Sequence, residues 1–137
     1  MKLPFLLIAV LLGNPSSIRI ISAQSQYQCF ATKEELKAAV ILYADGTCNS
    51  GSDCGRTYGY PIDTWCLWNT TANAGVTDIS FLFYDIVDFN DDLNGWNTEK
   101  VTNMNSMFMY AEEFNGDISD WNVEKVTNMG SMFKVRA

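Results

Sequence analysis

The sequence repeats itself with a period of 25 residues. The stretch FNDDLNGWNTEKVTNMNSMF begins at Phe89 and FNGDISDWNVEKVTNMGSMF begins at Phe114, and the two agree at 14 of 20 aligned positions. A unit of this length cannot bury its own apolar side chains, so neighbouring copies must stack and share one core. The repeat therefore predicts an array of coils in which each residue lies over its counterpart in the next copy.

A weaker copy precedes the two clean ones. Its landmarks are a tryptophan at Trp68 and a Val-Thr pair at Val76, separated by a small insertion that the later copies lack. We therefore expect about three copies, at 58–88, 89–113 and 114–137. The last copy stops at SMFKVRA, where the pattern of the preceding copy would continue, so we expect a truncated product or an incomplete gene model.

Each copy divides into two parts with different apolar spacing. The part that follows the Val-Thr pair has the i, i+3, i+4, i+7 spacing of a short amphipathic helix, with Thr102 or Asn103 as its N-cap: its apolar residues are Met104, Met107, Phe108 and Ala111. The part around DISDWNVEKV reads as a short strand with flanking turns. The expected repeat core comprises Trp96, Val101, Met104, Met107, Phe108, Trp121, Val126, Met129, Met132 and Phe133.

Residues 24–57 form a different kind of segment. Thr32 and Glu35 are spaced as a capping box, in which each side chain satisfies a free backbone N–H at the start of a helix. Apolar residues then follow at the spacing of a helix face, namely Leu36, Ala39, Val40 and Tyr43. We expect a helix over about residues 33–43 that covers the start of the array.

The first residues indicate the compartment. One lysine and then the apolar run LPFLLIAVLLG give residues 1–23 the form of a secretory signal peptide, with a possible cleavage site after Ala23. We see no second apolar segment that could serve as a transmembrane anchor. The formal net charge of −7 argues against nucleic acid as a partner, because phosphate binding needs clustered Lys and Arg.

The four cysteines agree with secretion. Cys29, Cys48, Cys54 and Cys66 suggest two disulfide bonds, for which three pairings are possible. We favour Cys48–Cys54, which closes a short loop, together with Cys29–Cys66. Zinc is disfavoured, since the chain contains no histidine and no CxxC pair.

Catalytic and metal chemistry have few candidate groups. Without histidine, only carboxylate pairs such as Asp91 with Asp92, or Asp117 with Asp120, could serve a glycosidase-like reaction. We interpret them as turn residues, because they recur with the repeat. The series Asp88, Asn90, Asp92 and Glu99 has the spacing of an EF-hand loop, but Leu93 stands where that loop requires glycine. We expect no catalytic residue, no metal and no cofactor.

Two further features concern glycans. Asn69 begins the triplet NTT, an N-glycosylation acceptor if the source is eukaryotic. Trp65, Trp68, Trp96 and Trp121 could stack on sugar rings, but the repeat register favours core positions for Trp96 and Trp121. The recurring asparagines, such as Asn103 with Asn128, are expected to hydrogen-bond the backbone of the next copy.

The pattern FNxDIxxWxVxxVTNMxxMF resembles the repeats of the BspA-like surface proteins, a family related to leucine-rich repeats. The resemblance extends over about residues 58–133, although Asn97 and Asn122 replace the family's usual Asp, and Glu99 and Glu124 its common Ser. It implies an α/β, leucine-rich-repeat-like solenoid of short strand plus short helix coils, with an N-terminal cap helix. The implied role is a secreted or cell-surface, non-catalytic protein that recognises or adheres to an extracellular protein or glycan. Alternatives are a carbohydrate-active enzyme and a structural matrix component.

Overall fold

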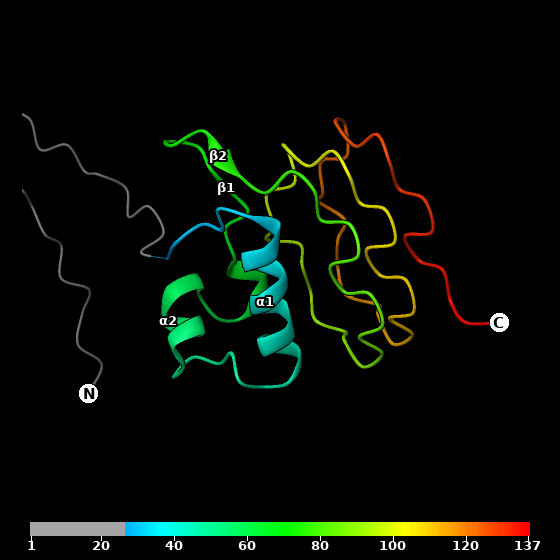
Figure 1. Ribbon diagram of the computed structural model, residues 1–137, viewed down its shortest axis with the longest axis horizontal. Coiled ribbons are helices and arrows are strands. Elements are labelled where there is room, and N and C mark those ends of the chain that lie inside the picture. The colour runs from blue at the N-terminus through cyan, green and yellow to red at the C-terminus, as the bar shows by residue number, and fades with distance from the viewer. Residues whose placement is uncertain (1–26) are drawn as a thin grey trace, which may run out of the picture.

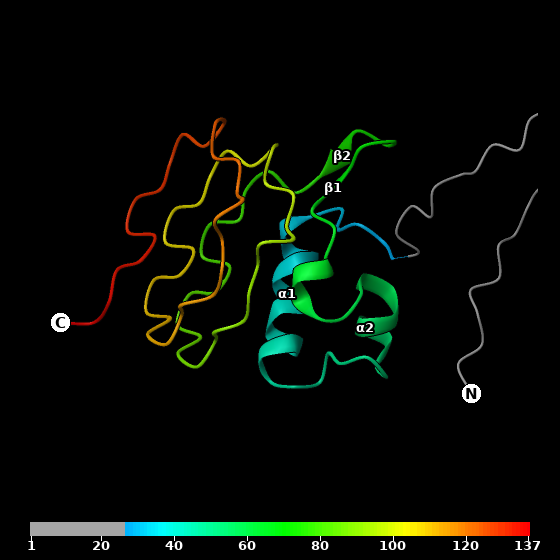
Figure 2. The same cartoon turned by 180° about the vertical axis from the view of Figure 1, so that it is seen from behind.

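The computed structural model describes residues 27–137, and the expected signal peptide over residues 1–23 lies outside them. The elements in chain order are α1 (Lys33–Ala44), α2 (Asp53–Tyr58), a 3₁₀ turn (Ile62–Thr64), and two short strands, β1 (Trp68–Asn69) and β2 (Ala74–Gly75). Residues 76–137 consist of turns and isolated β-bridges. They run back and forth in layers that lead away from α1 towards the C-terminus, as both views show (Figures 1 and 2).

Helix α1 begins as its sequence predicts. The side chain of Thr32 accepts a hydrogen bond from the Glu35 N–H at 3.1 Å, and the Glu35 carboxylate accepts one from the Ala31 N–H at 2.8 Å. These bonds satisfy donors that the first turn leaves without a helical partner. The helix buries Leu36 and Val40 completely, so its apolar face is part of the core.

Two disulfides hold the segment around α1. Cys29–Cys66 joins the chain before α1 to the chain before β1, and Cys48–Cys54 closes the loop between α1 and α2. This is the pairing that we favoured from the sequence. The Cys29–Cys66 pair also forms a parallel β-bridge, so the covalent link and the backbone pairing fix the same contact.

The insertion in the first copy forms the only hairpin of the described residues. β1 and β2 are antiparallel, with Trp68 opposite Gly75 and Asn69 opposite Ala74. The Val76 N–H then donates to the Leu67 carbonyl at 2.8 Å, which brings the chain back to the start of the regular pattern. The hairpin projects from the rest of the molecule (Figure 1).

Successive copies pair in parallel through their backbones. Asn103 forms bridges with both Asp78 and Asn128, its counterparts one copy earlier and one copy later. Alternate N–H groups of the first copy donate to carbonyls of the second, as from Phe83 to Met107 at 2.9 Å. The same bonds join the second copy to the third, as from Phe108 to Met132 at 2.9 Å. The pairing is thus continued across all three copies.

Turns occupy the segment for which the sequence predicted a short helix. The N–H groups of Met104, Ser106 and Phe108 donate to the next copy, so they are not available for bonds within a helix. Ser106 and Tyr110 also have positive φ, which a right-handed helix does not allow. The predicted strand around DISDWNVEKV is likewise a pair of turns, closed by bonds such as Trp121 N–H to the Ile118 carbonyl at 3.3 Å.

Like side chains stack on like side chains in the core. The rings of Phe83 and Phe108 lie 5.2 Å apart at an interplanar angle of 9°, and those of Phe108 and Phe133 lie 5.5 Å apart at 4°. Trp96 and Trp121 stack in the same way, with centroids 6.3 Å apart and an angle of 9°. Equivalent rings therefore form continuous columns along the array.

The tryptophan columns also carry polar bonds. The indole N–H of Trp121 donates to the Leu93 carbonyl at 2.8 Å, and that of Trp96 donates to the Ile62 carbonyl at 2.7 Å. Each indole therefore reaches back towards the preceding copy. A buried indole N–H without such an acceptor would cost free energy.

Most of the predicted repeat core is buried, but its outer end is not. Val126 is half-buried, Met129 is 46% exposed and Phe133 is 53% exposed. These residues belong to the third copy, whose outer face has no later copy over it among the described residues. The remaining predicted core residues are buried, namely Trp96, Val101, Met104, Met107, Phe108, Trp121 and Met132.

No helix within residues 27–137 is long and apolar enough to cross a membrane.

The two disulfides should contribute unequally to stability. They close loops with sequence separations of 37 and 6 residues. Loop-closure entropy then gives about 4 kcal/mol for Cys29–Cys66 and about 2 kcal/mol for Cys48–Cys54. We expect the Cys29→Ser/Cys66→Ser variant to lose more unfolding free energy in urea than the Cys48→Ser/Cys54→Ser variant. Equal losses would contradict the loop-length argument.

Position along the array should decide the cost of removing a core phenylalanine. Phe108→Ala removes a ring enclosed between two copies and should cost about 3–5 kcal/mol of unfolding free energy. Phe133→Ala removes a half-exposed ring and should cost about 1 kcal/mol or less. Urea unfolding followed by tryptophan fluorescence measures both losses of unfolding free energy. The prediction is contradicted if Phe133→Ala loses more unfolding free energy than Phe108→Ala.

Candidate functional site

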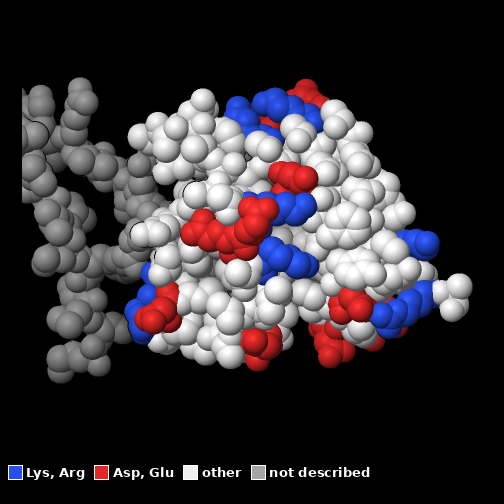
Figure 3. Space-filling view, in the orientation of Figure 1, with Lys and Arg blue, Asp and Glu red and all other residues white. Residues whose placement is uncertain are grey.

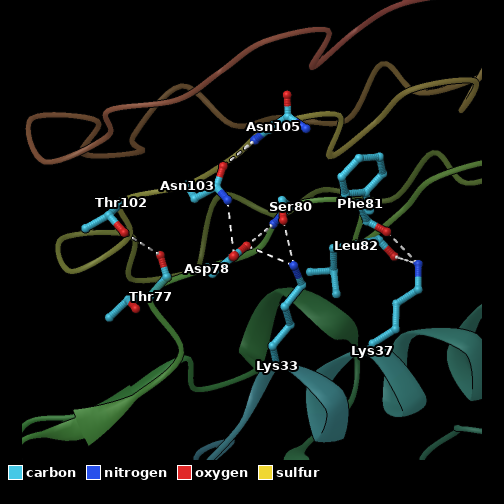
Figure 4. A network of polar contacts seen from close by, with 10 residues as sticks. All are labelled: Lys33, Lys37, Thr77, Asp78, Ser80, Phe81, Leu82, Thr102, Asn103 and Asn105. Carbon is cyan, nitrogen blue, oxygen red and sulfur yellow. Dashed lines mark hydrogen bonds and ion pairs between the residues drawn. The ribbon is translucent and has the colours of Figure 1, made fainter.

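A polar network joins α1 to the first copy (Figure 4). The ammonium of Lys33 donates to the Asp78 carboxylate at 2.9 Å and to the Ser80 hydroxyl at 2.6 Å. The Asp78 carboxylate also accepts from the Asn103 side chain at 3.1 Å, so the network continues into the second copy. Lys37 donates to the carbonyls of Phe81 and Leu82, at 2.6 and 2.7 Å.

The network keeps the Asp78 carboxylate ionised. Partial burial alone would raise the pKa of Asp78, but hydrogen bonds from Ser80, Lys33 and Asn103 outweigh it and lower the pKa to about 2. Burial lowers the pKa of Lys37, and the neighbouring charge of Lys33 acts in the same direction. Asp78 is therefore an ionised acceptor that holds α1 on the array, and it is a poor proton donor at neutral pH.

The recurring asparagines and aspartates bond to the next copy or to their own turn. The side-chain oxygen of Asn90 accepts from the Asn115 N–H at 2.6 Å, and that of Asp92 accepts from the Asp117 N–H at 2.7 Å. Asn128 instead accepts from the Gly130 N–H at 3.0 Å, within its own turn. These residues therefore complete the backbone bonding of the array.

The carboxylates considered for catalysis lie in turns on the surface. A single amide, that of Asn94, donates to Asp117 at 3.4 Å and to Asp120 at 3.0 Å. Bonds from the backbone N–H and side chain of Ser119 lower the pKa of Asp117. An acid catalyst needs the opposite shift, so this pair lacks the tuning of a general acid. Asp91 and Asp92 are both exposed, and Asp92 bonds the next copy.

The residues with EF-hand spacing do not converge. Asn90 and Asp92 bond the following copy, whereas Glu99 pairs with Lys100 at 3.1 Å and approaches Lys125 at 3.8 Å. Within residues 27–137, no group of three or more His, Cys, Asp or Glu could hold a metal ion. The spacing is thus a product of the repeat.

The residues considered for glycan chemistry lie in different places. Asn69 lies on β1, where its side-chain oxygen accepts from the Ala72 N–H at 2.8 Å. Trp65, Trp96 and Trp121 are buried and Trp68 is half-buried, so the tryptophans do not form a surface platform. The hairpin therefore presents the glycosylation acceptor, while the indoles serve the core.

A groove lies between the end of α1 and residues 85–91, where the first copy leads into the second. It encloses about 540 Å³, and its lining includes Tyr43, Asp85, Asp88 and Asp91. Burial raises the pKa of the Tyr43 hydroxyl above its usual range, and a hydrogen bond with Asp91 adds to the effect. The sequence assigned Tyr43 only to the helix core, so it did not indicate this groove.

A second surface feature has an aromatic character. Phe81 and Tyr84 are 45% and 39% exposed, and Tyr110 is half-buried beside them. Their ring centroids lie 5.8 Å apart for Phe81–Tyr84 and 5.6 Å apart for Tyr84–Tyr110. We call these three residues the aromatic strip. The repeat pattern does not predict this strip, because none of these three residues recurs in the other copies.

The ion pair between Lys33 and Asp78 should make the stability of the fold sensitive to acid. The pKa of Asp78 is about 2 in the fold against 3.8 as its ordinary value, so its ionised form contributes stability above pH 4. That contribution is lost as the pH falls from about 4 to about 2 and, allowing for solvent screening of this part-exposed pair, amounts to about 1 kcal/mol. We expect Asp78→Asn to be less stable at pH 6 and to show a smaller further loss at pH 2. Thermal unfolding across this pH range measures both, with Asp53→Asn as the control at an exposed position.

Comparison with known proteins gives one match. Residues 60–137 match the family model described as "Mycoplasma protein of unknown function, DUF285". The match covers the three copies and leaves out α1 and α2. No curated protein and no solved structure matches the chain.

Proposed function

The chain belongs to the DUF285 family, and from this premise we propose that it is a secreted or cell-surface recognition protein that binds an extracellular protein or glycan without transforming it. The proposal includes the architecture, which we assign to a leucine-rich-repeat-like solenoid of the BspA-like type, as the repeat pattern suggests. In this assignment α1 serves as the N-terminal cap, and adhesion is the role that the resemblance implies.

One observation carries the proposal, namely that recurring side chains build the core and the backbone bonding, while variable side chains lie on the surface. Recurring side chains such as Phe108, Trp96 and Asn90 are buried or bond to a neighbouring copy. Several positions on the surface change from copy to copy, as where Tyr84 in the first copy corresponds to Lys134 in the third, although others such as Glu99 and Glu124 recur. A scaffold whose surface can change without disturbing its packing is suited to recognition.

The covalent structure supports an extracellular setting. Both disulfides join cysteines that a reducing cytosol would keep as thiols. A signal peptide over residues 1–23 would take the chain to an oxidising compartment. There, the triplet at Asn69 would be available for glycosylation in a eukaryotic host.

Binding without turnover is the expected behaviour in solution. We expect the folded chain to bind saturably to at least one probe among immobilised mucin, gelatin and β-linked oligosaccharides, measured by biolayer interferometry. The reduced and unfolded chain is the control. We expect no hydrolysis of a panel of fluorogenic glycosides, because the paired carboxylates serve as turn acceptors.

Two results would contradict the proposal. Glycoside hydrolysis that is lost in Asp92→Asn or Asp117→Asn would make the chain a carbohydrate-active enzyme. Concentration-dependent association in sedimentation experiments, without binding to any probe, would favour a structural matrix component.

A further inference from the structure

The aromatic strip stands out from the repeat that surrounds it. We propose that Phe81, Tyr84 and Tyr110 form a binding site for an uncharged, β-linked oligosaccharide, whose sugar rings pack against these side chains. The proposal rests on the recognition function above and names the ligand class and the residues that bind it.

The internal repeat shows that the fold does not require these aromatic side chains. Ser106 and Ser131 occupy the position of Phe81 in the other copies. Likewise, Met109 and Lys134 correspond to Tyr84, and Asp85 and Val135 correspond to Tyr110. The chain therefore forms the same coil with small, aliphatic or charged residues at these positions. The stacking of successive copies therefore does not explain why three aromatic side chains lie together on one surface.

Phe81 provides a second argument through its backbone. Its φ is 58°, close to the 54° of Ser106 and the 55° of Ser131. The positive φ belongs to the coil, but a large side chain tolerates it less well than a small one. Phe81 is also 45% exposed, so its burial compensates only in part. A phenylalanine that is costly in this conformation and half-exposed fits a role in binding better than a role in stability.

Polar groups lie at both ends of the strip. At one end the Arg136 guanidinium lies 5.2 Å from the centre of the Tyr110 ring and pairs with Asp85. At the other end, Lys37 uses two N–H groups on the carbonyls of Phe81 and Leu82, and the third N–H of its ammonium remains for another acceptor. Apolar rings flanked by donors and acceptors match a sugar, which has C–H faces and hydroxyl edges.

Charge and area both favour a sugar over a protein partner. The chain carries a net charge of −7, yet the surface of the copies beside α1 shows a broad uncharged area bounded by charged groups (Figure 3). Phe81 and Tyr84 are 45% and 39% exposed and Tyr110 is half-buried. The three rings therefore offer roughly 200 Å², well below the roughly 800 Å² per partner of a stable protein interface. Phe81 and Tyr84 are largely exposed and do not line the groove beside Tyr43, so the site is open and suits an extended chain.

The test uses chitohexaose and cellohexaose as probes in isothermal titration calorimetry. Phe81→Ser and Tyr84→Met introduce the residues that other copies carry at these positions, so the fold should tolerate them. We expect each to weaken binding by about fivefold or more, because each removes one ring from the contact. Val123→Ser is the matched control, since Val123 is 46% exposed elsewhere on the array. It should leave the affinity unchanged.

The outcomes separate this proposal from the recognition function. Binding of either oligosaccharide that is weakened in Phe81→Ser and Tyr84→Met but not in Val123→Ser supports the aromatic strip. Equal binding by all four proteins, or binding only to gelatin, overturns the strip and leaves recognition in place. Failure of every probe to bind overturns both. Urea unfolding of each variant shows whether a loss of binding reflects a loss of fold.

Discussion

The whole structure depends on parallel backbone pairing between equivalent segments of successive copies. The Phe83 N–H bonds the Met107 carbonyl, and the Phe108 N–H bonds the Met132 carbonyl, so the offset is the same at both junctions. A constant offset places each side chain beside its counterpart, which is why Phe83, Phe108 and Phe133 form a column. Such a column accepts only residues that pack well against themselves. The close repetition of the sequence follows from this requirement.

The start of the array poses a problem that α1 solves. Between residues 79 and 110, the pairing bonds run mostly from the N–H groups of one copy to the carbonyls of the next. The corresponding carbonyls of the first copy have no earlier copy to bond them. Lys37 donates to the Leu82 carbonyl, whose counterpart at Met107 accepts a pairing bond, and to the Phe81 carbonyl, which also accepts from the Tyr84 N–H. Lys33 holds the side chain of Asp78. The Lys37 ammonium thus replaces a backbone donor, while Leu36 and Val40 cover the apolar core.

Local patterns predicted some features and misled on others. The capping box at Thr32 and the period of the repeat depend on neighbours in sequence or on exact recurrence, and both could be read directly. The helix expected at Met104 could not be distinguished from consecutive three-residue turns, because both bring residues three and four positions apart to one face. The bonds to the next copy and the positive φ of Ser106 and Tyr110 decide between them. The aromatic strip depends on differences between copies, so the recurring pattern does not indicate it.

The hairpin between Trp68 and Val76 shows where the architecture accepts new sequence. Its extra residues leave and rejoin the coil through the bond between Val76 and Leu67, so the pitch of the stack is unaffected. Gly75 makes this return possible, since a Cβ atom there would lie 2.2 Å from the Leu67 carbonyl oxygen. The turn of this hairpin is therefore a suitable insertion site. A peptide or tag inserted between the two strands would be exposed on the surface without changing the packing of the repeats.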